Sequence, residues 1–257
     1  MVENDFFKPS EVKAITSYLI TNFILGSVIM IIMAFFISLF STNYSVISLI
    51  DLVSKTPDLV NEADLPMYYN INTYTNLICY LFSFLFVCLY MRHHLISDYN
   101  VAKQKPLIYI LVGIGSAIIF YGVSLLVSIF IDSMVGVSEN QSLIEGMILN
   151  GGAIPVFFAV VIFAPIVEEL IYRKAIFHFL KNKHIIVSYI VSSVVFALPH
   201  MISTPIENIT DWLLMCIPYL VSAILLCLIY HLSKKNIYVV WIVHMINNLV
   251  SFILILL

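Results

Sequence analysis

The chain has 257 residues, of which 61% are hydrophobic and only 11% are charged. Because a soluble domain usually carries about 25% charged residues, this composition excludes an ordinary soluble enzyme and a disordered chain. The net charge of −3 and the lack of a long basic block give no sign of a nucleic-acid partner. We therefore predict an all-α, polytopic membrane helix bundle with the lipid bilayer as its surroundings.

The sequence contains seven apolar runs of the length that a membrane span needs, which is about 20 residues. They cover residues 14–40, 72–90, 107–131, 152–179, 184–200, 212–230 and 237–257. The first run is too long for the core of a secretory signal and lacks a small-residue cleavage pattern, so we expect a retained helix. No internal repeat or long linker divides the chain, which predicts a single membrane domain over residues 1–257.

Lysine and arginine residues fall almost entirely on one side of the predicted bundle. If the seven helices alternate in direction, eleven of the twelve basic residues lie at the N-terminal side, and only Lys55 lies at the other. The eleven are Lys8, Lys13, Arg92, Lys103, Lys105, Arg173, Lys174, Lys181, Lys183, Lys234 and Lys235. The positive-inside rule therefore predicts a multi-pass protein of the cell membrane with a cytoplasmic N-terminus and an external C-terminus.

The first of three polar motifs lies in the run at 152–179, where polar groups are costly unless paired or wet. Glu169 precedes Arg173 by four residues, which is the favourable order for an ion pair on one helix, and an interfacial pair explains both. Glu168 has no such partner on its own helix. Pro165 lacks the amide hydrogen that would bond to the carbonyl of Val161, which predicts a kink near the acids.

The other two motifs lie in later runs. Phe196 and His200 are four residues apart, and a lone histidine at a helix end is usually structural. His244 and Asn248 share one face of the last helix and have no neutralising charge on it. At 1.5 Å per residue, Glu168 and His200 reach the depth of His244 only if the hairpin between them protrudes into the cytoplasm. The basic residues spread from Arg173 to Lys183 suggest that it does.

These residue types suit hydrolysis of a peptide bond by an activated water molecule. A carboxylate accepts a proton from water, and a histidine orients that water or relays the proton. A second histidine and an amide donate hydrogen bonds to the oxyanion that forms. The sequence contains no G-x-S-x-G, no cysteine beside a histidine and no H-E-x-x-H zinc motif. It therefore lacks the usual sequence signatures of serine hydrolases, cysteine proteases and zinc peptidases of that class.

The three motifs resemble those of the CPBP family, the CAAX protease and bacteriocin-processing membrane endopeptidases. Its patterns E-E-x-x-x-R, F-x-x-x-H and H-x-x-x-N occur here in the same order, at 168–173, 196–200 and 244–248. The resemblance covers residues 152–257, whereas residues 1–135 form helices without a matching motif. Ala197 stands where the second pattern of the family often has a glycine. Lys174 stands where a glycine often follows the arginine of the first pattern.

The resemblance implies a membrane glutamic endopeptidase that uses neither a cofactor nor a metal. In this family the first glutamate and the first motif histidine activate water, which assigns that role to Glu168 and His200. The later histidine and asparagine form the oxyanion hole, which assigns it to His244 and Asn248. The supporting residues are Glu169, Arg173 and Phe196.

The leading hypothesis is an endopeptidase that cleaves a membrane-associated peptide or a lipidated C-terminal tail at the cytoplasmic face. The short loops favour the bacterial branch of the family, which is linked to bacteriocin maturation and self-immunity. Three alternatives stay open. They are a non-proteolytic regulator or immunity protein that binds partner proteins, a zinc hydrolase using Glu168, His200 and His244, and a small transporter with proton-relay residues.

Overall fold

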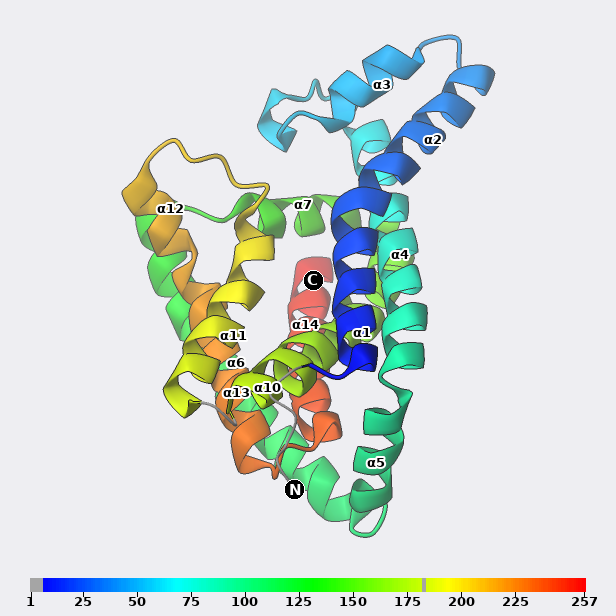
Figure 1. Cartoon of the computed structure of the whole chain (residues 1–257). Coiled ribbons are helices and arrows are strands. Elements are labelled where there is room, and N and C mark those ends of the chain that lie inside the picture. Colours follow the sequence, from blue (N-terminus) through cyan, green and yellow to red (C-terminus); the bar gives the residue numbers. More distant parts are fainter. Residues whose placement is uncertain (1–6, 182–183) are drawn as a thin grey trace.

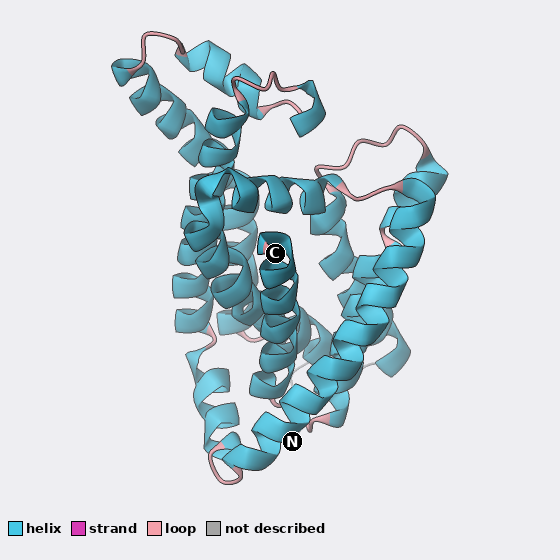
Figure 2. Ribbon diagram, turned by 180° about the vertical axis from the view of Figure 1, so that it is seen from behind, coloured by secondary structure: helices cyan, strands magenta, loops and turns pink. Residues whose placement is uncertain are grey.

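The computed structural model describes residues 7–181 and 184–257, and every regular element in these two ranges is a helix (Figures 1 and 2). The elements labelled α are α-helices, η2 is a 3₁₀-helix, and the other η elements are π-helical. In chain order they are α1 (Pro9–Leu19), η1 (Ile20–Leu25), α2 (Gly26–Phe40), α3 (Val46–Val53), η2 (Pro57–Leu59), α4 (Leu65–Tyr90), α5 (Arg92–Ala102), α6 (Pro106–Val135), α7 (Glu139–Met147), η3 (Ile148–Gly152), α8 (Ala153–Val156), η4 (Phe157–Phe163), α9 (Ala164–Glu168), η5 (Glu169–Phe177), α10 (His178–Lys181), α11 (Ile185–Met201), α12 (Ile209–Met215), α13 (Ile217–Leu232) and α14 (Ile237–Leu256).

Six helical stretches within the described ranges are long and apolar enough to cross a membrane. They are Pro9–Phe40, Leu65–Tyr90, Pro106–Val135, Glu139–Leu180, Ile209–Leu232 and Ile237–Leu256. The remaining predicted span corresponds to α11, which is apolar but has only 17 residues. Its length of about 25 Å is slightly less than the hydrocarbon thickness of a bilayer. The predicted all-α, polytopic membrane bundle is therefore confirmed, with six full-length spans and one short apolar helix.

The outer surface of the bundle is apolar. On α6 the side chains of Leu107, Ile118 and Leu126 are among many large hydrophobic groups that are exposed. A continuous apolar surface of this kind would be unfavourable in water and suits contact with lipid. Of the polar and charged side chains that the three motifs supply, Glu168, Glu169, Arg173 and His244 are instead buried.

The bundle has two ends, and Figure 1 shows which helices lie at each. One end, which we call the α7 end, contains α3, α7, α12 and the C-terminal end of α14. The opposite end, which we call the α5 end, contains α5, α10 and the start of α14. Helix α14 runs through the middle of the bundle and packs against α6, α13 and η4.

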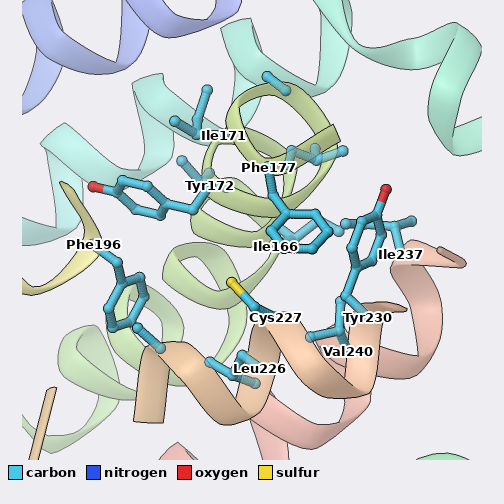
Figure 3. Packing of buried hydrophobic residues seen from close by; sticks show 14 of the residues in the cluster. Ile166, Ile171, Tyr172, Phe177, Phe196, Leu226, Cys227, Tyr230, Ile237 and Val240 are labelled. Carbon is cyan, nitrogen blue, oxygen red and sulfur yellow. The ribbon is translucent and has the colours of Figure 1, made fainter. Parts of the chain in front are cut away.

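The core surrounds the helix that carries the first motif (Figure 3). On α14 the inward face repeats at helical spacing, because Ile237, Val240, Val243 and His244 are all buried. Figure 3 shows how side chains of η5, α11, α13 and α14 meet there. They include Tyr172, Phe177, Phe196, Leu226, Cys227, Tyr230, Ile237 and Val240. This packing fixes the distance between the first and third motifs.

The helical stretch from 139 to 180 is irregular in two ways. It breaks at Asn150 and Gly151, and Gly151 has φ +93°, a conformation that favours glycine. Beyond the break, π-helical turns alternate with α-helical ones, and the amide of Ala164 donates to the carbonyl of Ala159. Pro165 follows directly and has no amide hydrogen. Its position is where the π-helical hydrogen bonds of η4 give way to the α-helical ones of α9. Such π-helical insertions are frequent at functional sites.

Candidate active site

The first motif places Glu169 and Arg173 in the core. Both side chains are fully buried, and Nε of Arg173 lies 3.2 Å from Oε2 of Glu169. Nη2 of Arg173 donates to the carbonyl of Ala223 at 3.3 Å, and the guanidinium lies 4.5 Å from the ring centre of Phe196. The structure therefore brings Glu169 and Arg173 together as a pair that is buried inside the bundle.

Lys174 is also buried, and its Nζ donates to both carboxylate oxygens of Asp98 at 2.8 and 2.7 Å. Two of the basic residues that suggested a protruding hairpin, Arg173 and Lys174, are therefore buried. Each of them has a carboxylate partner inside the bundle, and that of Lys174 comes from α5, far away in the sequence. Lys183 of the same hairpin lies outside the described residues.

Glu168 gains its partners from other helices. Its side chain is only 3% exposed, and its Oε1 accepts a hydrogen bond of 3.0 Å from the hydroxyl of Tyr80 on α4. Its Oε2 lies 3.9 Å from Nε2 of His244 on α14. The carboxylate that lacks a partner on its own helix therefore lies between α4 and α14.

His244 and Asn248 are both held by groups of the 150–180 segment. Nδ1 of His244 lies 2.8 Å from Oε1 of Glu169. Because Glu169 is paired with Arg173 and is a carboxylate, it accepts this hydrogen bond, and Nδ1 carries the hydrogen. Nδ2 of Asn248 donates to the carbonyl of Val160 at 2.9 Å, which leaves its second amide hydrogen for another acceptor.

His200 has a defined tautomer. Its Nδ1 lies 2.9 Å from the carbonyl oxygen of Phe196, and a carbonyl only accepts, so Nδ1 is the donor. In the neutral ring Nε2 is then unprotonated and accepts hydrogen bonds. The ring lies between Phe196 and Tyr219, with centroid separations of 4.9 and 4.8 Å.

Glu168, His200, His244 and Asn248 all line one cavity of about 710 Å³. This volume lies in the usual range for ligand and substrate sites, about 300–1,000 Å³. From the four side chains the cavity extends toward the α7 end, where its lining includes Asp132, Ser138, Asn140, Gln141, Glu145, Leu149 and Met215. None of the residues that the structure describes along its wall is a lysine or an arginine.

Residues 150–250, which carry all three motifs, match the family model of the Rce1-like type II CAAX prenyl endopeptidases. This segment is therefore similar to the CAAX protease family. An uncharacterized protein of Mycoplasma capricolum subsp. capricolum is 30% identical to the chain over 167 residues. That alignment covers 60% of this chain and 46% of the relative, so the chain spans less than half of the length of this relative. No solved structure matches the chain.

The Rce1-like segment does not supply the whole site. Tyr80 contacts Glu168 directly and, with Asn76, reaches the cavity from α4, in the part of the chain that carries no family motif. A tyrosine in an apolar run has no distinguishing sequence signal, because tyrosines are common in membrane helices. Its contact with Glu168 depends on the packing of α4 against α9.

The zinc alternative requires three converging ligands. Within residues 7–181 and 184–257, no group of three or more His, Cys, Asp or Glu side chains is arranged to hold a metal ion. The donor geometry therefore does not fit the ligand set Glu168, His200 and His244.

Proposed function

We propose that the chain is an intramembrane endopeptidase of the CAAX protease type, acting on a membrane-associated peptide or a lipidated C-terminal tail. The observation that carries the proposal is the common cavity, because it brings a carboxylate, two histidines and an amide together around one space. The match of residues 150–250 to the Rce1-like family supports the same reaction class. The water nucleophile would be activated by protein side chains alone.

Glu168 and His200 are suited to activate the water. Since Oε1 of Glu168 is occupied by the hydroxyl of Tyr80, Oε2 is the oxygen that takes the proton. His200 has its Nδ1 hydrogen fixed on a main-chain carbonyl, so Nε2 accepts a hydrogen bond from the same water. A general base of this kind typically contributes a factor of about 10² to 10⁴ in rate.

His244 and Asn248 are suited to stabilise the oxyanion. Asn248 donates its second amide hydrogen. Because Nδ1–H of His244 is bonded to Glu169, Nε2 donates only when the ring is an imidazolium.

The substrate reaches these groups from the α7 end. Ser138, Asn140 and Met215 line the cavity at that end of the bundle, the last two from the short helices α7 and α12. None of the described residues that line the cavity comes from α5. Apart from the buried Arg173 and Lys174, the predicted topology puts nine of the ten remaining basic residues on the side of the membrane that carries the α5 segment. The positive-inside rule then makes the α7 end external, which replaces access from the cytoplasm in our proposal.

The test is cleavage of a peptide library by purified protein in lipid nanodiscs, with new termini identified by mass spectrometry. We expect Asn248→Ala to lower kcat by a factor of about 10² to 10³, as loss of one oxyanion donor does. Ser251→Ala is the matched control, because Ser251 lines the same cavity on the same helix. Folded wild-type protein that cleaves no peptide, or an Asn248→Ala variant as active as the control, would contradict the proposal.

A further inference from the structure

We propose that Tyr80 is a positioning residue for Glu168. Its hydroxyl holds one carboxylate oxygen, Oε1, so that the other, Oε2, faces the cavity. The inference rests on the proposed peptidase function and extends it to the N-terminal helices, which lie outside the family-matched range of 150–250.

The contact itself is short and shielded. The hydroxyl of Tyr80 donates to Oε1 of Glu168 at 3.0 Å, and the carboxylate is buried while both residues line the cavity. A hydrogen bond to an ionised acceptor is about twice as strong as one between neutral groups. Oε2 of Glu168 has His244 as its neighbour at 3.9 Å, beyond hydrogen-bond distance. The two oxygens are therefore in different environments, and Tyr80 makes that difference.

A second hydroxyl contact joins the motif helix to α1, on which α4 packs. The hydroxyl groups of Tyr18 on α1 and Tyr172 on η5 are 2.9 Å apart, and both side chains are buried. Helix α4 also packs on α1, α9 and η4. The backbone of Tyr80 is thus held against the motif helix independently of its own hydroxyl, and removing that hydroxyl should leave the packing intact.

The chemical consequence follows from the rotamer freedom of a carboxylate. Without the phenol, the terminal torsion of Glu168 is broad, and Oε2 faces the attacking water for a smaller fraction of the time. Loss of one hydrogen bond to a charged group should lower kcat about ten- to a hundredfold. Phenylalanine keeps the ring, so the shape of the cavity and KM should be preserved.

The experiment compares Tyr80→Phe with Tyr74→Phe. Tyr74 lies on the same helix, is exposed outside the cavity and makes no hydrogen bond to any residue that the structure describes, so it is the matched control. We expect the first variant to lose ten- to a hundredfold in kcat with KM within twofold of wild type, and to stay folded with a melting temperature lowered only by the loss of one hydrogen bond. The control should match wild type in all three.

An infrared measurement keeps the inference testable without activity. The carboxylate band of Glu168 is assigned by its loss in Glu168→Gln, and it should shift in Tyr80→Phe but not in Tyr74→Phe. An active wild type with an equally active Tyr80→Phe variant, or an unshifted band, overturns the role of Tyr80. A folded wild type without peptidase activity overturns the proposed function instead, whatever the band does.

Discussion

The ion pair between Asp98 and Lys174 connects α5 to the helix of the first motif. The two side chains are 12% and 9% exposed, and Nζ of Lys174 lies within 2.8 Å of both carboxylate oxygens. Oδ2 of Asp98 also accepts the amide of Ile237, the first residue of α14, at 2.9 Å. One carboxylate thus holds both the helix of Glu168 and the helix of His244.

Removal of either partner should destabilise the fold strongly. A buried pair that loses one member leaves an uncompensated charge, at a cost of about 3–5 kcal/mol. This is a large part of the total stability of a typical domain, about 5–15 kcal/mol. Asp98→Ala should cost more than Lys174→Met, because it also removes the acceptor of the Ile237 amide. In Lys174→Met the carboxylate of Asp98 keeps that amide as a donor.

A double-mutant cycle measured by denaturation in detergent micelles tests the pair. The double variant Asp98→Ala/Lys174→Met should cost less than the sum of the single variants, by at least about 1 kcal/mol. Lys55→Met is the control, since Lys55 pairs with Asp51 at the surface, with side chains 38% and 64% exposed. It should cost less than about 1 kcal/mol. Strict additivity, or an Asp98→Ala variant no less stable than the control, would refute the reasoning.

Three further predictions concern packing, topology and the second glutamate. Gly152→Ala should lose about 1–3 kcal/mol in thermal unfolding, because a Cβ would lie 2.6 Å from a main-chain carbonyl. Gly115→Ala, which meets nothing within 4 Å, should not lose stability; equal losses would contradict this. In a cysteine-free background, Lys105→Cys should be labelled only from the cytoplasm and Asp211→Cys only from outside, and the reverse pattern would invert the topology. Glu169→Gln should lower the yield of folded protein and reduce turnover per folded molecule without abolishing it, and complete loss of turnover at full yield would contradict its supporting role.

Hydropathy and periodicity predict much of this fold. The apolar runs mark the membrane helices, and the spacing of Val240, Val243 and His244 predicts one inward face of α14. The four-residue spacing also predicts the pairing of Glu169 with Arg173, since residues four apart on a helix are neighbours. Such local relations depend on the chain's own helix geometry and need no tertiary information.

Contacts between helices that are far apart in the sequence cannot be predicted from hydropathy or periodicity. Lys174 follows Arg173 in a basic stretch, so a count of charges places it in a solvated loop. Its partner Asp98 is 76 residues away, and only packing of η5 near α5 and the start of α14 buries the pair. The same holds for Tyr80, whose neighbour Glu168 is 88 residues away. A single sequence carries no signal for these pairings.

The role of Glu168 as the base that activates water is the central claim, and one substitution tests it most directly. Glu168→Gln keeps the size of the side chain and its acceptor for Tyr80 but cannot take a proton. In vesicles, with cleavage normalised to folded protein, the variant should lose a factor of about 10² to 10⁴ in rate while it stays folded. A Glu168→Gln variant that cleaves at the wild-type rate would contradict the account.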